Sequence, residues 1–153
     1  MAVAVMGDLV ASREADDRNA LNQALVDVLE AANHGVDQQW RPVTPRRITV
    51  GNEFQGVFAT LGAALRATLR IRLALTPYDV RFGLGRGDVT VLSEEPRVED
   101  GPAWWAARHA IEVGAVAQRR AASRSVRVTY ASDPVGSTDP AVAAACSLPD
   151  DLA

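Results

Sequence analysis

An unbroken apolar run near the start of the chain constrains the fold more than any other feature. Residues 2–6 read AVAVM, and Gly7 and Asp8 follow directly. A strand with one solvated face alternates apolar and polar residues, whereas a continuous apolar run is typical of a strand covered on both faces. We therefore predict a strand that is buried on both faces and carries an acid at its end.

Apolar residues at helical spacing predict three helices. The first extends over about residues 15–33, where leucines, valines and alanines recur every three or four positions. The second begins at Leu61 and ends before Pro77, and the third runs from Pro102 to about Arg120. All three patterns are typical of helices that bury one face.

Strand patterns fill the intervals between these helices. Residues 46–58 read as a hairpin around the turn-prone pair Gly51-Asn52, and residues 80–89 and 126–130 read as further strands. The resulting order, β-α-β-β-α-β-α-β, is that of an α+β ferredoxin-like sandwich. We expect a mostly antiparallel sheet with the helices packed on one of its faces.

Three glycines mark one face of the strand predicted at 80–89. Gly83, Gly85 and Gly87 alternate along it and leave bare backbone, which a helix, a partner chain or a ligand can approach closely. The strand-to-helix context of a dinucleotide-binding loop is missing. We interpret the glycines as a close packing surface.

Length and charge indicate one acidic domain. Residues 1–131 are expected to form it, and residues 132–153 to form a polar tail or linker with a short helix. The net charge of −3 gives no basic field for nucleic acid, and no apolar run is long enough to span a membrane. The single cysteine, Cys146, excludes an internal disulfide. We expect a soluble, cytoplasmic protein.

All 16 basic residues are arginines, because the chain has no lysine. This excludes Schiff-base chemistry, a lysine general base and the phosphate-binding lysine of a Walker motif. An anionic ligand must therefore meet arginine side chains or backbone amides.

The acid at the end of the first strand is a candidate metal ligand together with the turn that follows residue 50. Asp8, Asn52 and Glu53 offer hard oxygen ligands of the kind that Mg²⁺ and Mn²⁺ prefer. Asp8 can equally cap the following turn by accepting backbone N–H bonds, and Asn52 can simply occupy a tight turn. The residues alone leave both interpretations open.

Four segments together resemble the SatD family of bacterial proteins over about residues 3–131. They are GDLVASR at 7–13, GNEFQG at 51–56, RFGLGRG at 81–87 and DGPAW at 100–104. This resemblance implies a fold but no particular reaction.

The same segments are similar, more distantly, to the palm of class III nucleotidyl cyclases. Asp8 matches the first metal-binding acid of that family, and Leu9 the residue whose backbone carbonyl completes the metal site. The second acid falls on Asn52, an amide that brings no charge. Arg108 matches the arginine that stabilises the phosphoryl transition state, which makes it the candidate catalytic residue.

The chain departs from the cyclase pattern at the positions that read the nucleotide. The base-reading lysine falls on Ile48, beside Arg47, and the base-reading acid falls near Arg97. The asparagine that positions the ribose falls on Trp104. The resemblance therefore implies a retained anion or nucleotide pocket more than cyclase chemistry.

The leading hypothesis is a regulatory or sensory module, homodimeric, that binds a nucleotide-like or anionic ligand. Its candidate ligand-binding residues are Asp8, Leu9, Ser12, Arg13, Arg47, Asn52 and Arg108, with Mg²⁺ or Mn²⁺ on Asp8, Asn52 and Glu53. One alternative is an active metal-dependent cyclase or phosphoryl-transfer enzyme in which Glu53 replaces the missing acid. A second is a dimeric interaction platform for a DNA-binding regulator.

Two further features have competing interpretations. Arg108 can clamp a phosphate or pair with Glu112, four residues along the same helix. Trp104 and Trp105 can stack on a base, fill an interface or anchor the core, and adjacent helical positions point about 100° apart. His34 and His109 form no metal cluster in the sequence, and neither is assigned a role.

Overall fold

A computed structural model of the chain describes residues 1–10, 17–34, 37–49 and 51–133. In chain order its helices and strands are β1 (Ala2–Leu9), α1 (Arg18–Asn33), β2 (Thr44–Ile48), β3 (Glu53–Phe58), α2 (Leu61–Leu75), β4 (Val80–Gly87), β5 (Thr90–Glu94), β6 (Arg97–Asp100), α3 (Pro102–Ala117) and β7 (Val128–Ser132). Short 3₁₀ turns lie at Gln38–Trp40 and Ala121–Ser123. No described helix is long and apolar enough to cross a membrane.

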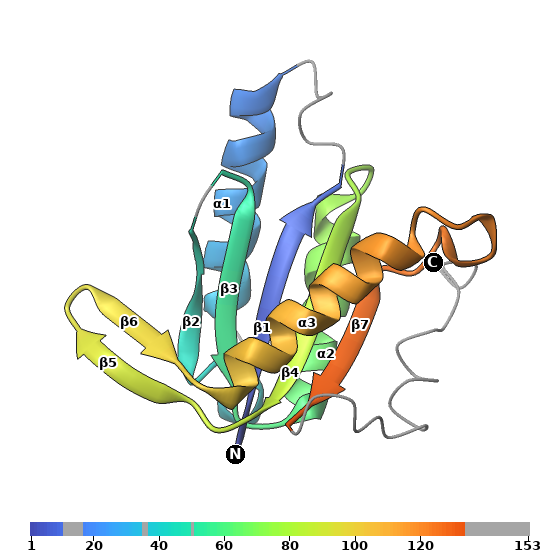
Figure 1. Cartoon of the computed structure of the whole chain (residues 1–153). Coiled ribbons are helices and arrows are strands. Elements are labelled where there is room, and N and C mark those ends of the chain that lie inside the picture. Colours follow the sequence, from blue (N-terminus) through green and yellow to red (C-terminus); the bar gives the residue numbers. More distant parts are fainter. Residues whose placement is uncertain (11–16, 35–36, 50, 134–153) are drawn as a thin grey trace.

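The main sheet of the described chain has five strands in the order β2-β3-β1-β4-β7 (Figure 1). The pairs β2–β3, β3–β1 and β1–β4 are antiparallel, whereas β7 joins β4 in parallel. The predicted burial of the first strand on both faces is confirmed, and its place is the centre of the sheet. The mostly antiparallel α+β fold is confirmed as well. The terminal acid Asp8 consequently lies between two neighbouring strands.

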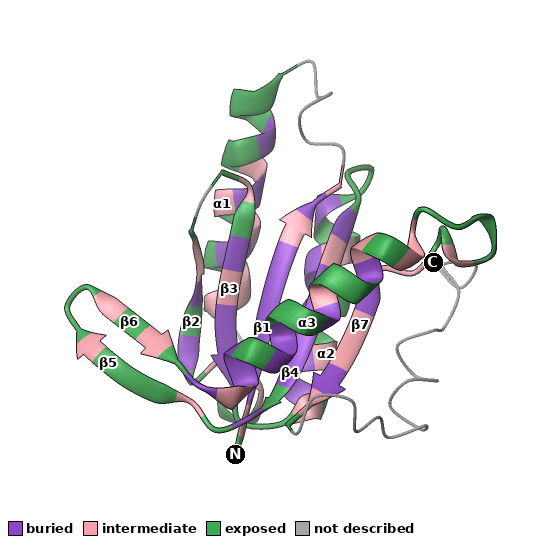
Figure 2. Ribbon diagram, viewed as in Figure 1, coloured by how far each residue is buried: buried purple, intermediate pink, exposed green. Residues whose placement is uncertain are grey.

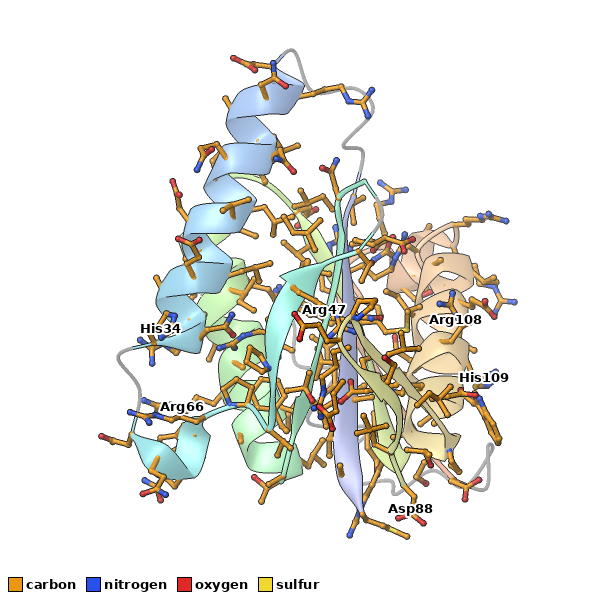
Figure 3. All side chains as sticks on the ribbon, turned by 90° about the vertical axis from the view of Figure 1, so that its left-hand side faces the viewer. His34, Arg47, Arg66, Asp88, Arg108 and His109 are labelled. Carbon is orange, nitrogen blue, oxygen red and sulfur yellow. The ribbon has the colours of Figure 1, made fainter. Side chains whose placement is uncertain are left out.

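Helices cover both faces of the sheet, so the prediction of helices on one face is wrong. Val3 and Val5 of β1 pack in the core with α1 and α2, whereas Ala4 and Met6 pack with α3. Figure 3 shows the three layers from the side, with α3 alone on its face. The reason lies in the run itself, because consecutive residues of a strand point to opposite faces and both faces of this one are apolar. Figure 2 shows the central strands buried accordingly.

The glycine face of β4 is the surface against which α3 packs. A Cβ atom on Gly85 would lie 2.1 Å from the carbonyl oxygen of Ala103, and one on Gly83 would lie 2.4 Å from that of Ala107. Such distances are far below van der Waals contact, so these positions admit no side chain. The predicted close packing is confirmed, with the helix as the occupant.

The helix starts follow ordinary capping chemistry. Asp17 caps α1 by accepting a 2.9 Å hydrogen bond from the amide of Ala20, and the hydroxyl of Thr60 caps α2. Pro102 occupies the first turn of α3, where its missing N–H costs nothing. The cap explains why α1 begins at Arg18, a few residues after the predicted start.

The hairpin of β5 and β6 was not predicted. Most of its residues are exposed, so it lacks the alternating apolar pattern that identifies a strand in the sequence. It is tied to β2 through Glu99, whose buried carboxylate accepts hydrogen bonds from Thr44 (2.6 Å) and from Arg97 (3.1 Å). The hydrogen bond to Glu99 raises the pKa of Arg97 above its ordinary value.

Candidate functional site

A pocket of about 230 Å³ opens at the carboxyl end of β1, between the sheet and α3. Strands β1, β3 and β4 supply its floor, and α3 supplies one wall. Its lining residues are Met6, Gly7, Asp8, Thr49, Glu53, Phe54, Arg81, Arg108, Ile111, Glu112 and Ala115. Five of these eleven carry a charge, which is unusual for a space beside a protein core.

Asp8 and Arg81 form a two-pronged ion pair in the floor of this pocket. The two residues are direct partners in the β1–β4 register. Nε of Arg81 donates to one carboxylate oxygen at 3.0 Å, and Nη2 donates to the other at 2.6 Å. Both side chains are largely buried, at 24% and 19% exposed. This fork-to-carboxylate geometry is the strongest form that such a pair takes.

Glu53 lies on the other side of Asp8, as its direct partner in the β1–β3 register. Cross-strand partners project from the same face of a sheet, so Glu53, Asp8 and Arg81 form one row over three adjacent strands. All three line the pocket. Glu53 is exposed, in contrast to the ion pair beside it.

The residue before Asp8 allows this row to pack closely. Gly7 is the register partner of Phe54, and a Cβ atom on Gly7 would lie 2.3 Å from the tip of the Phe54 ring. The ring therefore needs glycine at this position. Phe54 in turn makes an edge-to-face contact with Phe82, at 5.8 Å between ring centroids, which joins β3 and β4 under the row.

Helix α3 brings a cation and an acid to the pocket wall. Arg108 and Glu112 lie one turn apart on an exposed part of the helix and both line the pocket. Neither has a hydrogen bond or ion pair with any described residue, so of the two alternatives for Arg108 the pairing with Glu112 is not formed. Arg108 is labelled in Figure 3 on the α3 side of the sheet. It is thus the cation available to a ligand.

The described residues do not fit a divalent metal in this arrangement. Both carboxylate oxygens of Asp8 already accept hydrogen bonds from Arg81. No three His, Cys, Asp or Glu side chains of the described chain lie close enough together to hold an ion. Asn52 lies in the β2–β3 turn and is not among the residues that line the pocket. The next residue, Glu53, is the one that lies in the row with Asp8 and Arg81.

Two of the other predicted ligand residues are not among those that line the pocket. Leu9, which was predicted to contribute its backbone carbonyl, has its side chain in the core with α1 and α2. Arg47 donates at 3.1 Å to the backbone carbonyl of Arg97 and so braces the hairpin instead of lining the pocket. Ser12 and Arg13 lie outside the described residues, as does Cys146.

Sequence reasoning missed Arg81 as a site residue. It was read only as part of the strand motif that begins the glycine face. A signal was present, because Arg81 shares its alternation with Gly83, Gly85 and Gly87 and so points to the face that α3 covers. Pairing the two strands in register would have placed it against Asp8.

The two adjacent tryptophans separate as helical geometry requires. Trp104 is buried against Ala4, Met6 and Val57, whereas Trp105 is 59% exposed. The indole N–H of Trp105 donates to Asp100 at 2.9 Å. Neither residue lines the pocket, so stacking on a ligand there has no support from the structure.

A smaller cavity lies on the α1–α2 side and is lined by three arginines, Arg46, Arg66 and Arg70. Arg46 is buried and stacks over the ring of Phe58 at 5.3 Å. Burial, and secondarily the charge of Arg70, lower its pKa to about 10. Arg46 also donates to the end of α1 through the side chain of Asn33, so it serves as a structural link.

Comparisons with known proteins identify the family and agree with the fold. The sequence model of a protein family, described as "SatD family (SatD)", matches residues 2–134 of the chain. The structure is similar to the monomeric guanylyl cyclase domain of the RhoGC fusion protein from the aquatic fungus Blastocladiella emersonii, with a TM-score of 0.56 and 16% identity over 72% of this chain and 74% of that one. It is also similar to a bacterial light-regulated adenylyl cyclase, with a TM-score of 0.54 and 13% identity over 85% and 74%. A search of curated proteins gave no match.

Proposed function

Since the chain belongs to the SatD family and has the fold of cyclase palm domains, we propose that it is a regulatory or sensory module that binds a nucleotide-like ligand in the pocket beside Asp8. The observation that carries the proposal is the separation of charges in that pocket. The charge of Asp8 is matched by Arg81, and the same pocket is lined by Arg108, which has no ion-pair partner among the described residues.

Arg108 is the group that would hold the anionic part of the ligand. A guanidinium without a carboxylate partner binds phosphate or carboxylate oxygens well, through paired N–H donors. Asp8 does not repel such a ligand strongly, because its charge is already matched by Arg81.

The acids at the rim favour a nucleotide over a simple anion. Glu53 and Glu112 line the same pocket as Arg108. Ionised carboxylates only accept hydrogen bonds, so they suit the hydroxyls of a sugar or the amino group of a base. A ligand that carries both an anion and several donors would satisfy both sets of residues.

The pocket size limits how much of the ligand is enclosed. Its volume of about 230 Å³ is below the roughly 300–1,000 Å³ typical of sites that surround a whole ligand. We expect the phosphate end to be held and the rest to extend over the rim.

Equilibrium binding tests this proposal directly. Nucleoside mono-, di- and triphosphates and cyclic nucleotides would be titrated calorimetrically into wild type, Arg108→Ala and Arg119→Ala. Arg119 is an exposed arginine just beyond α3 and serves as the matched control. We expect saturable binding that weakens at least tenfold in Arg108→Ala alone. Absence of saturable binding to every nucleotide would contradict the proposal.

A metal-dependent phosphoryl-transfer enzyme is the second candidate, and one observation favours it. Glu53 is the register partner of Asp8, so a second acid does stand beside the first despite the amide at Asn52. Incubation of each nucleoside triphosphate with Mn²⁺ and the protein would decide between the two. Product that disappears in Asp8→Ala would establish the enzyme, and none at high protein concentration would eliminate it.

We also propose that the protein is a homodimer. Large apolar side chains are exposed on the β5–β6 hairpin and at the start of α3, namely Val91, Leu92, Val98 and Trp105. Clusters of exposed apolar residues are typical of interaction surfaces. Light scattering coupled to gel filtration should give twice the 16.3 kDa chain mass, and Leu92→Asp should shift it toward one chain.

A further inference from the structure

We propose that Arg81 is a built-in counter-cation that occupies the metal-binding side of Asp8, so that the pocket excludes divalent cations and takes its ligand without one. The exclusion of metal stands on the geometry of the pocket alone. The statement about the ligand rests on the proposed function.

Arg81 is fixed in place from both ends. Nε and Nη2 hold the two oxygens of Asp8, and Nη1 donates to Oε1 of Gln118 at 3.1 Å. Gln118 is itself held, because its amide donates to the carbonyl of Val126 at 2.6 Å. The guanidinium therefore bridges the end of α3 to the sheet and is not a mobile surface side chain.

Electrostatics in the row disfavour a dication. Glu53 and Asp8 without Arg81 would present two negative charges side by side, as two-acid metal sites do. With Arg81 in place the row keeps one net negative charge, and a cation that approached Asp8 would meet a guanidinium already on both oxygens. Asn52 adds no charge to compensate.

Displacing Arg81 would not restore a metal site without cost. The guanidinium is largely buried, so leaving Asp8 would break its two-pronged ion pair and keep only the contact with Gln118 that it makes now. Metal binding must therefore outweigh the loss of a two-pronged ion pair. The ligand, in contrast, meets an Asp8 whose charge is already matched, together with the charge of Arg108.

Binding of Mn²⁺ alone tests the inference, measured by electron paramagnetic resonance and calorimetry without any nucleotide. We expect no saturable binding up to millimolar Mn²⁺ in wild type or in Arg86→Met, an exposed arginine of the same strand. Arg81→Met should bind Mn²⁺ at least tenfold more tightly, and a further Asp8→Asn should remove that gain.

Several outcomes would overturn the inference. Wild type that binds Mn²⁺ in the micromolar range and loses it in Asp8→Asn would do so. Folded Arg81→Met without any gain would do so as well, with folding checked by circular dichroism and with Arg81→Gln as the milder replacement should the first variant unfold.

Metal-free binding of the ligand is tested by a separate measurement. Nucleotide binding by wild type should be equal in EDTA and in Mn²⁺, and a requirement for Mn²⁺ would refute metal-free binding. Absence of nucleotide binding together with the expected Mn²⁺ results would count against the proposed function only.

Discussion

The carboxylate of Asp8 accepts two hydrogen bonds from the guanidinium of Arg81, its direct partner across β1 and β4, at 3.0 and 2.6 Å. The charge of Asp8 is therefore matched by a cation that the chain itself supplies.

Asp8→Asn should destabilise the fold by about 1–3 kcal/mol, because it leaves a largely buried guanidinium without its counter-charge. Arg81→Met should cost a similar amount. The double variant should cost less than the sum of the two, which urea unfolding of all four proteins would show. Additive losses would mean that the pair contributes nothing as a pair.

Gly85→Ala should cost about 3 kcal/mol or prevent folding, because the added methyl group would lie 2.1 Å from the backbone of α3. Gly62→Ala is the matched control. Nothing lies within 4 Å of a Cβ there, and the residue is in the first turn of α2, so alanine should be neutral or stabilising by up to about 1 kcal/mol. The midpoint temperature of thermal unfolding should fall for Gly85→Ala and should stay the same or rise for Gly62→Ala.

Glu99→Gln should loosen the β5–β6 hairpin, because its buried carboxylate is the acceptor for both Thr44 and Arg97. We expect faster hydrogen exchange in the hairpin amides and a global loss of about 1 kcal/mol. Glu94→Gln removes an exposed partner of the same arginine and should change little. Equal effects of the two variants would contradict the assigned role of Glu99.

Arg70→Gln should stabilise the protein by a few tenths of a kcal/mol, because it removes a like charge that lowers the pKa of the buried Arg46. The gain should shrink at high salt, since screening weakens the same repulsion. Arg46→Ala should instead destabilise by about 2 kcal/mol or more through lost contact with Phe58 and with the end of α1. Chemical unfolding at low and high salt would separate these effects.

Asn52→Asp should not create a Mn²⁺ site, although it restores the acid that the cyclase pattern has at this position. Asn52 is not among the pocket residues, and Arg81 would still hold Asp8. Electron paramagnetic resonance spectra of Mn²⁺ should be the same with this variant as with the wild-type protein. A new saturable site would show instead that the turn rearranges to bring residue 52 into the pocket.

Much of the fold was predictable because local patterns dictate it. The apolar run 2–6 indicated a strand buried on both faces, periodic leucines indicated α1 and α2, and Gly51-Asn52 marked the hairpin turn. The alternating glycines of β4 announced a close approach, which α3 makes. The exposed β5–β6 hairpin was not predicted, because it is held to β2 by Glu99, whose partner Thr44 is distant in sequence.

The sequence by itself indicated Asp8, the Gly51-Asn52-Glu53 turn and Arg108 as candidate site residues, and it made arginine the residue that would meet an anion, since the chain has no lysine. Only the tertiary structure decided which of them meet. Strand register sets Glu53 and Arg81 on either side of Asp8 and leaves Asn52 outside, and register depends on pairing between segments that lie about 45 and 73 residues apart. No local pattern contains that information, because the side chains become neighbours only when the sheet forms.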